Sequence, residues 1–481
     1  MDEINQYSLF IDGDWVASSG TARLTVRNPA TGETIATAAD ATDADIDRAV
    51  QSAAAAFPAW SRRTALERAD FLLRLNTLIQ RDHERLARLL TQEVGKPIRE
   101  ARGEIDFAIS LIRFAAENAR RLEGDIVPGS RPGEKILIDK QPHGVIAGIS
   151  AWNFPAGLLA RKVAPALAAG NTIVLKPHEL TPVTSLEIAR LVAEAEFPAG
   201  VVNIVSGGIP AGQRLVANPA VKMVTMTGST AAGKKIMAAA APTLKEVRLE
   251  LGGKAPFIVL ADADLEAAAS AAVEARFLNA GQVCTCNERT YVHEAVYDRF
   301  LELVSQKIGE IKVGDPSNED TTMGPKISAA ELEKVEAMVA KAVHQGARVR
   351  IGGARLSGGV YERGHFYGPT LLTDVTHEMD IVQSEVFGPV MSVLKVRDFD
   401  EALKLANDSS YGLSAYLFTK DLGVLMRTAA ELNFGEIYVN RSLGEAPQGF
   451  HHGYGDSGLG GEDGKYGLEA YVRTKTIYLN A

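Results

Sequence analysis

The sequence predicts an α/β protein that is built on buried parallel β-sheet. Short runs rich in β-branched residues alternate with helix-like stretches over residues 144–253, which is the pattern of repeated strand–helix–strand units. A second pattern of the same kind begins near residue 254. The chain has 481 residues, enough for about three domains of ordinary size, so it can hold both patterns.

The composition is that of an ordinary globular protein, with 46% hydrophobic and 23% charged residues. The formal net charge of −9 gives no support for nucleic acid as a partner, because duplex binding needs a basic face. Only two cysteines are present, which favours a reducing, cytoplasmic location. The N-terminus lacks the pattern of a signal peptide, and no apolar run is long enough to span a membrane.

The N-terminal third is predicted to be largely helical. Thr64 and Glu67 form a possible capping box, and apolar residues then recur at three- and four-residue steps as far as Leu90. This spacing indicates one amphipathic helix or a broken pair of helices, which Gly95 and Pro97 end.

Two further segments predict an extended arm. Residues 123–145 hold two extended runs around a Gly/Pro-rich turn, which is typical of a hairpin. The final run, YVRTKTIYLN, alternates like an edge strand and could pair with the 123–145 arm of another subunit.

Candidate site residues follow the strands of the first predicted sheet. A parallel sheet binds ligands beyond the carboxyl ends of its strands, and Asn153, Lys176, Gly228 and Glu250 all lie at such ends. The five predicted strands are residues 144–150, 171–177, 201–207, 222–228 and 246–253. In the second pattern the predicted helices are 262–276, 294–309 and 329–345, and the strands are 366–375, 389–396 and 436–440.

Cys284, in NAGQVCTCNER, is the candidate nucleophile, as a thiolate at a loop or helix start. The alternative is a small buried hydrophobe, which is the usual role of a free cysteine. A metal site is not supported, because Cys284 and Cys286 supply two ligands and no second cluster completes four. A disulfide across one intervening residue would be strained.

Glu250 and Asn153 each have a functional and a structural interpretation. Glu250 ends a buried strand, where it is either a general base whose pKa burial has raised or a member of a structural ion pair. Asn153, in WNFP, could donate its amide to an oxyanion or could be a turn residue.

Two segments suit a dinucleotide. GSTAAG at 228–233 opens a helix after a strand, as phosphate sites do, although it departs from GxGxxG and an ordinary turn is equally compatible. Lys176 could reach a ribose or phosphate, and Glu179 could accept hydrogen bonds from both ribose hydroxyls. The alternative for this pair is a solvent-facing ion pair.

Together these segments show that the chain resembles the aldehyde dehydrogenase superfamily from end to end. Seven segments match in order and spacing, including the 34 residues from Glu250 to Cys284. The matching segments are NPATGE (28–33), WNFP (152–155), GNTIVLKP (170–177), TGST (227–230), LELGGKAP (249–256), GQVC (281–284) and EVFGPV (385–390).

The resemblance implies a Rossmann-like NAD-binding domain, a second α/β catalytic domain and a β-arm for oligomerisation into dimers or tetramers. The expected boundaries are 1–122 and 144–253 for the NAD-binding domain, 254–445 for the catalytic domain, 123–143 and 468–481 for the arm, and 446–467 for a return to the NAD-binding domain.

The resemblance also implies the residue roles. Cys284 would attack the aldehyde, Asn153 and the Cys284 backbone N–H would stabilise the oxyanion, and hydride would pass to NAD. Glu250 would then activate the water that releases the acid. No metal and no role for Cys286 are implied. The implied cofactor-binding residues are Trp152, Lys176, Glu179, Gly228, Ser229, Glu385 and Phe387.

Within the family, the chain is most similar to bacterial lactaldehyde (glycolaldehyde) dehydrogenases, through LLARKVAPAL, GQVCTC and EAPQGFHHGY. That likeness implies a polar substrate tunnel and a short α-hydroxy aldehyde as substrate. A preference for NAD over NADP is expected because the Glu179 carboxylate would accept from a free 2′-hydroxyl and repel a 2′-phosphate. Alternatives are a dehydrogenase for an anionic aldehyde, such as succinate semialdehyde or sulfolactaldehyde, a thiol esterase without hydride transfer, and an inactive binding protein. The implied tunnel residues are Phe154, Arg161, Glu445 and His451.

Overall fold

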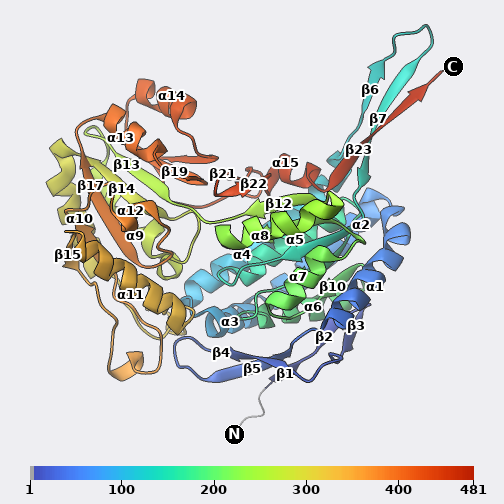
Figure 1. The fold of residues 1–481 in the computed structure, drawn as a ribbon, viewed down its shortest axis with the longest axis horizontal. Coiled ribbons are helices and arrows are strands. Elements are labelled where there is room, and N and C mark those ends of the chain that lie inside the picture. Colours follow the sequence, from blue (N-terminus) through green and yellow to red (C-terminus); the bar gives the residue numbers. More distant parts are fainter. Residues whose placement is uncertain (1–4, 481) are drawn as a thin grey trace.

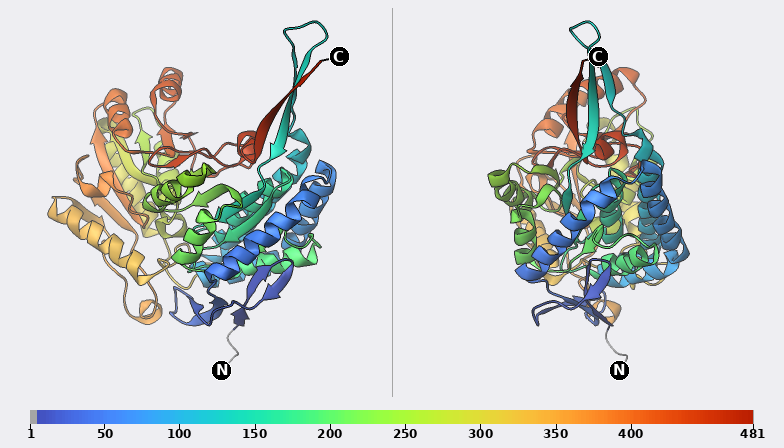
Figure 2. Two further views of the ribbon diagram at one scale, coloured as in Figure 1. Left: turned by 45° about the vertical axis from the view of Figure 1, so that its right-hand side comes forward. Right: turned by 90° about the vertical axis from the view of Figure 1, so that its right-hand side faces the viewer.

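The computed structural model describes residues 5–480, which form two α/β lobes and a projecting β-arm (Figure 1). The first lobe contains an eight-stranded sheet and the second lobe a seven-stranded sheet. Viewed from two further directions, the arm extends well beyond both lobes (Figure 2). The predicted α/β class is therefore confirmed.

The N-terminal third begins with strands that the sequence analysis did not predict. Residues 5–39 form a small three-stranded sheet, β1-β5-β4, and a hairpin that extends the eight-stranded sheet. The expectation of a largely helical segment is wrong here. β1, β2 and β3 have three residues each, too few for period-two alternation to be recognised, whereas the RLTVR of β4 does alternate and was a strand signal. The strands are β1 (Asn5–Tyr7), β2 (Leu9–Ile11), β3 (Asp14–Val16), β4 (Arg23–Arg27) and β5 (Thr34–Ala39).

The helices that follow match the prediction of a broken pair. Thr64 and Glu67 form the predicted capping box, and Gly95 ends the second helix in the left-handed conformation, φ 83°. Its missing Cβ matters, since a side chain there would collide with Pro29 and Pro325. The helices of this region are α1 (Asp43–Ser61), α2 (Ala65–Arg81), α3 (His83–Val94) and α4 (Ile98–Asn118).

The eight-stranded sheet has the order β22-β12-β11-β8-β9-β10-β2-β3, and its five central strands are parallel. The chain winds outward in both directions from β8, so a switch point lies between β8 and β11. All five predicted strands of this sheet are confirmed. They are β8 (Val145–Ile149), β9 (Thr172–Lys176), β10 (Val202–Ile204), β11 (Val221–Thr227) and β12 (Glu246–Glu250).

Helices cover both faces of this sheet, and the strands are apolar on both sides. Ile146 packs in the core beneath α2–α6, whereas its neighbours Val145 and Ala147 pack in the core beneath α1 and α7. This arrangement explains the uninterrupted apolar runs in the sequence. The helices are α5 (Pro155–Ala168), α6 (Val183–Glu194), α7 (Ile209–Ala217) and α8 (Thr230–Ala240).

The second lobe has the strand order β15-β16-β17-β14-β13-β19-β20, in which β15 alone pairs antiparallel. The strands are β13 (Ala255–Val259), β14 (Asn287–His293), β15 (Arg348–Ile351), β16 (Thr370–Thr373), β17 (Val390–Val396), β19 (Ser414–Phe418) and β20 (Glu436–Val439). The helices are α9 (Leu265–Phe277), α10 (Tyr297–Gly309), α11 (Ala329–His344), α12 (Asp380–Gln383), α13 (Phe399–Asn407) and α14 (Leu422–Glu431).

The C-terminal segment crosses back to the first lobe. Short strands β18 and β21 pair with each other, and β22 joins the edge of the eight-stranded sheet beside β12. A return of the chain to the first lobe was predicted for residues 446–467. These elements are β18 (Tyr411–Gly412), β21 (Tyr454–Gly455), β22 (Gly458–Leu459) and α15 (Gly464–Glu469).

The arm consists of β6 (Asp125–Pro128), β7 (Lys135–Pro142) and β23 (Val472–Leu479), so the predicted hairpin is confirmed. The expected pairing of the last strand with the arm of another subunit is not confirmed. β23 pairs antiparallel with β7 of its own chain, from Val472 opposite Pro142 to Leu479 opposite Lys135. The alternating pattern indicates an edge strand but carries no information about which chain supplies its neighbour.

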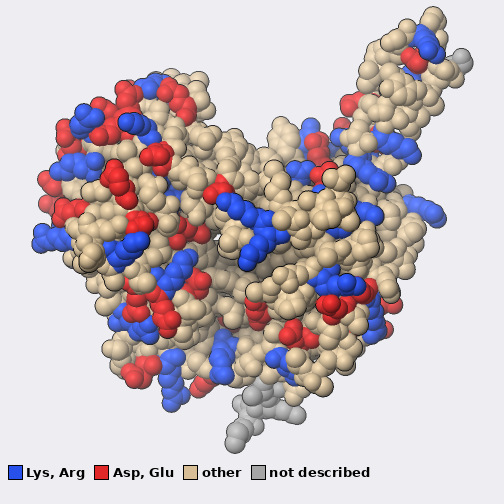
Figure 3. Space-filling model, in the orientation of Figure 1, with Lys and Arg blue, Asp and Glu red and all other residues tan. Residues whose placement is uncertain are grey.

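Acidic and basic side chains are interspersed over the face drawn in Figure 3, without a large basic patch. Among residues 5–480, no helix is both long enough and apolar enough to cross a bilayer.

Candidate functional site

Two cavities meet at Cys284, between the two lobes. The larger, of about 320 Å³, runs past Phe154, Leu158 and Arg161 of the α5 segment. The smaller, of about 120 Å³, lies at the carboxyl edge of the eight-stranded sheet. Asn153, Thr227 and Cys284 line both cavities. A molecule in either cavity would therefore come close to the thiol of Cys284.

The structure separates the two cysteines that the sequence could not. Cys284 is partly exposed to the cavities, whereas Cys286 is fully buried and its thiol lies 2.8 Å from the carbonyl of Val283. Burial raises the pKa of Cys286 to about 12. Burial also raises the pKa of Cys284, but a hydrogen bond with His451 opposes that rise. Only Cys284 is placed to act as a nucleophile.

Asn153 is fixed by a buried ion pair. Lys96 donates to the backbone carbonyl of Asn153 at 2.8 Å and pairs with Glu104. Glu104 in turn accepts from the first free N–H groups of α5, at Ala156 (2.8 Å) and Gly157 (3.2 Å). The Asn153 loop is thus held rigidly at the end of β8.

The amide of Asn153 points toward the loop that carries Cys284. Its Nδ2 donates to the carbonyl of Gln282 at 3.0 Å, and the side chain is buried. An N–H group that is oriented in advance beside a nucleophile can stabilise an oxyanion without reorganisation.

Glu250 ends β12, and its buried side chain lines neither cavity but lies beside His451, which lines the larger one. Neither carboxylate oxygen makes a hydrogen bond within the part of the chain that the structure describes. Burial raises the pKa of Glu250 to about 8, and the charge of His451 limits the rise. A carboxyl group with these surroundings is suited to accept a proton near neutral pH.

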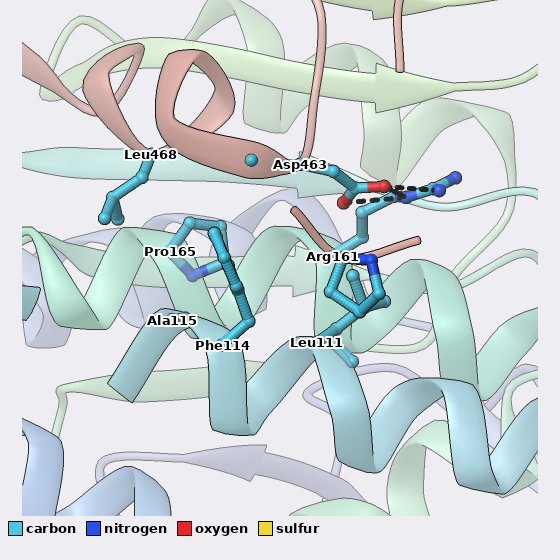
Figure 4. Close-up of a pocket in the computed structure, with 10 residues that line it drawn as sticks. Leu111, Phe114, Ala115, Arg161, Pro165, Asp463 and Leu468 are labelled. Atoms are coloured by element: carbon cyan, nitrogen blue, oxygen red, sulfur yellow. Dashed lines mark hydrogen bonds and ion pairs between the residues drawn. The ribbon is translucent and has the colours of Figure 1, made fainter. Parts of the chain in front are cut away.

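Arg161 carries the main charge of the larger cavity and is paired twice. Its Nη2 donates to Glu445, and its Nε donates to both oxygens of Asp463, at 2.9 and 3.1 Å. Figure 4 shows the guanidinium held against Asp463, above a small apolar cavity between α4 and α5. The positive charge of Arg161 is therefore already balanced.

Asp463 was missed by the sequence analysis. Two neighbouring basic residues pair with two neighbouring acidic residues: Arg161 binds Asp463, and the adjacent Lys162 binds Glu462 at 2.7 Å. All four side chains are buried. The signal in the sequence was an Arg-Lys doublet in an otherwise apolar helix and a Glu-Asp doublet in a Gly-rich tail, 300 residues apart.

His451 lies at the centre of the acidic side chains. Its Nε2 is 3.6 Å from Glu250, and its Nδ1 is 3.3 Å from Glu436 and 3.9 Å from Glu445. Burial alone would lower the pKa of His451, but the carboxylate of Glu445 and other acids outweigh it and raise the pKa well above its usual value. The sequence analysis anticipated His451 and Glu445 but not Glu436.

Glu436, Glu445 and His451 also place three ligand atoms within 4.8 Å of one another. Metal binding there is poorly supported, because Arg161 already supplies a positive charge to Glu445 and the imidazole itself favours the charged form. The expectation of no metal stays a prediction.

The smaller cavity holds most of the predicted cofactor residues. Trp152 and Phe387 meet edge to face, with ring centroids 5.4 Å apart. Glu385 accepts from the backbone N–H of Gly253 at 2.8 Å, and burial raises its pKa to about 7. A Cβ at Gly252 would lie 2.7 Å from this carboxylate, so the glycine keeps the space beside it open.

Gly228 and Ser229 line the same cavity at the start of α8. The Ser229 side chain accepts from the N–H of Ala232 at 3.3 Å and so caps the helix. The free N–H groups of this helix end are suited to an anion. Contact of Ser229 with a pyrophosphate stays a prediction.

Lys176 and Glu179 lie at the carboxyl end of β9, next to α7. Lys176 is buried and donates to the carbonyls of Pro177 (2.9 Å) and Gly207 (2.8 Å). Glu179 is half-buried, with its carboxylate 3.7 Å from the Lys176 ammonium. The pair is therefore not a fully solvated one, and its carboxylate remains open to a ligand.

Comparison with known proteins places this geometry in a family. The model of the aldehyde dehydrogenase family matches residues 15–477. Over 478 residues, the chain is 46% identical to a 3,6-anhydro-α-L-galactose dehydrogenase of Vibrio sp. (strain EJY3), covering 99% of this chain and 100% of the relative. It is also 46% identical to the lactaldehyde dehydrogenase of Escherichia coli K12, covering 99% of each chain.

A crystal structure of Escherichia coli lactaldehyde dehydrogenase superposes with a TM-score of 0.97 over the full length of both chains, at 45% identity. A D-glyceraldehyde dehydrogenase (NADP(+)) of Thermoplasma acidophilum is 41% identical, covering 98% of this chain and 96% of the relative. Relatives of similar identity thus bear the names of different aldehydes, and one of them is named for NADP(+).

Proposed function

Because the chain belongs to the aldehyde dehydrogenase family, whose members use NAD(P), we propose that it oxidises a small polar aldehyde to the carboxylate with NAD. The observation that carries the proposal is the position of Cys284, where two cavities meet: a mainly apolar one that carries Arg161, Glu445 and His451, and a second one suited to a dinucleotide. One cavity would hold the aldehyde and the other the nicotinamide end of the cofactor.

The residues around the smaller cavity fit NAD. Glu385 and Phe387 would hold the nicotinamide ribose, and the start of α8 would face the pyrophosphate. Lys176 and Glu179 would bind the adenosine ribose, since a carboxylate can accept from both hydroxyls. When bound, the cofactor accepts a hydride from the carbon that Cys284 has attacked.

The side chains of the site then perform the remaining steps. Cys284 attacks the aldehyde carbon as a thiolate, and the Asn153 amide stabilises the oxygen that becomes negative. After oxidation to the thioester, Glu250 takes a proton from water, and the resulting hydroxide releases the acid from sulfur. Since the base is present, the acyl group would be hydrolysed rather than transferred.

The paired state of Arg161 refines the choice of substrate. An anionic aldehyde would have to compete with Glu445 and Asp463 for a guanidinium that both already bind. Glu445 lines the cavity and burial does not neutralise it, because His451 and Arg161 keep its pKa at about 2. A neutral hydroxy aldehyde of the lactaldehyde or glycolaldehyde kind suits these hydrogen-bonding groups better than succinate semialdehyde or sulfolactaldehyde.

The test is NADH formation with a panel of hydroxy-, carboxy-, alkyl- and aryl-aldehydes. We expect the highest kcat/KM with short hydroxy aldehydes. A preference for long alkyl or aryl aldehydes would contradict recognition by Arg161, Glu445 and His451, and a preference for carboxy aldehydes would restore the anionic alternative. Hydrolysis of thioesters with no NADH from any aldehyde would instead support a thiol esterase.

A further inference from the structure

One side chain of the site contacts both the nucleophile and the base. The imidazole of His451 and the thiol of Cys284 line the same cavity, where the imidazole lowers the pKa of the thiol against the effect of burial, and Nε2 of His451 lies 3.6 Å from the carboxylate of Glu250. The sequence analysis assigned His451 to the substrate tunnel, in contact with the aldehyde. Its position between Cys284 and Glu250 gives it another task.

The groups that surround the imidazole hold it in the charged form. Its Nδ1 lies at ion-pair distance from two carboxylates, and its side chain is only 2% exposed. The positive charge of Arg161 opposes protonation, but Asp463 and Glu445 bind that guanidinium. The titratable groups that face His451 are Arg161, Glu250, Cys284, Glu436, Glu445, His452 and Asp463.

We propose that the imidazolium of His451 donates its Nε2–H first to the thiolate of Cys284 and then to the carboxylate of Glu250. Only the contact between Nε2–H and the thiolate is independent of the proposed function; the attack on the aldehyde and the second step rest on it. It makes His451 a catalytic residue that touches a reacting atom, in addition to any contact with substrate.

In the first step the Cys284 thiol loses its proton to water in the cavity, and the sulfur anion accepts from Nε2–H. The sulfur electron pair then forms the C–S bond, and the C=O π pair moves to oxygen. The buried sulfur anion needs this donor, because burial alone raises the pKa of the thiol.

In the second step the sulfur is part of an uncharged thioester and no longer attracts the imidazolium. Nε2–H then faces Glu250, whose two oxygens make no hydrogen bond within residues 5–480. The positive charge opposes the effect of burial on this carboxyl, so it favours the ionised base when water must be activated.

The first step is tested on the enzyme without cofactor. The rate of Cys284 alkylation by iodoacetamide is measured from about pH 5 to about pH 10, at intervals of about half a pH unit. Peptide mass spectrometry identifies the alkylated cysteine. We expect His451→Gln to move the midpoint of the profile up by about one pH unit or more, which is about tenfold slower alkylation at pH 7.

His452→Gln is the matched control. His452 is the neighbouring residue, but it packs between the rings of Phe450 and Tyr454, with centroids 4.6 and 5.1 Å away, and does not line the cavity. Its profile should superpose on that of the wild type. If His451→Gln fails to fold, Glu436→Gln is the second variant. It removes a carboxylate that stabilises the charged imidazole from outside the cavity, and it should shift the alkylation profile in the same direction.

A profile for His451→Gln or a folded Glu436→Gln that superposes on the wild type would overturn the proposal. The assay uses no aldehyde and no cofactor, so its outcome is separate from that of the proposed function. A shifted profile in a protein that oxidises no aldehyde would leave the thiolate contact standing and refute the function.

Discussion

Arg161 and Asp463, 302 residues apart in the chain, form a buried ion pair in which Nε donates to both carboxylate oxygens, at 2.9 and 3.1 Å. The pair joins α5 to the C-terminal segment and limits the charge that Arg161 can offer a substrate. It is therefore a structural link, and under the proposed function we expect it to determine specificity as well.

Replacing Asp463 should change the substrate preference. In Asp463→Asn, Arg161 loses one of its two carboxylate partners while the side chain at position 463 keeps its shape. An anionic aldehyde can then pair with the guanidinium. We expect kcat/KM for succinate semialdehyde to rise about tenfold relative to glycolaldehyde, a difference of about 1.4 kcal/mol. Glu462→Gln is the control, since Glu462 binds Lys162 instead and should leave the ratio unchanged.

Removing Arg161 should affect both stability and specificity. Arg161→Ala leaves Glu445 and Asp463 buried without their partner, which costs about 3–5 kcal/mol in the free energy of unfolding. Urea denaturation measures that loss. In the folded fraction, kcat/KM should fall more for hydroxy aldehydes than for propanal, and an equal fall for all aldehydes would contradict a polar contact with substrate.

The two cysteines should differ sharply in function. Cys284→Ala removes the nucleophile and should abolish NADH formation, whereas Cys286→Ala removes a buried thiol from a packed site and should retain turnover at the cost of some thermal stability. Steady-state kinetics and thermal unfolding measure the two effects. Loss of activity in the second variant with retention in the first would reverse the assignment.

Deacylation should depend on pH through Glu250. The base acts as a carboxylate, and burial raises its pKa to about 8, so the deacylation rate should rise with pH and level off above about 8. In Glu250→Gln we expect at most about one equivalent of NADH per site, followed by a stall with a deacylation rate lower by about 10²–10⁴. Rapid-quench detection of the thioester checks this, and steady turnover near the wild-type rate would rule out the role.

Cofactor preference should depend on Glu179. A carboxylate about 4–6 Å from a 2′-phosphate is repelled by on the order of a few kcal/mol, which suffices for a preference of about tenfold or more for NAD. Glu179→Gln keeps the size of the side chain and should narrow the ratio of kcat/KM for NAD over NADP. Equal efficiency of the wild type with both cofactors would contradict the prediction.

The sequence by itself determined the parallel sheet of the first lobe, the hairpin of the arm and the positions of Asn153 and Glu250 at strand ends, because these follow from local signals. Apolar runs define buried strands, and motif residues come directly after them. It could not determine the partner of β23, since an edge pattern does not specify which chain lies beside it.

Only the tertiary structure decided which of Cys284 and Cys286 faces the cavities, since the two are a single residue apart and have the same chemistry. It also paired Arg161 with Asp463 and surrounded His451 with Glu250, Glu436 and Glu445. These contacts join segments up to 302 residues apart. Such pairing depends on how both lobes and the C-terminal segment pack. The physical reason is that a buried charge is stable only where the fold places an opposite charge beside it, and that partner can come from a distant part of the sequence.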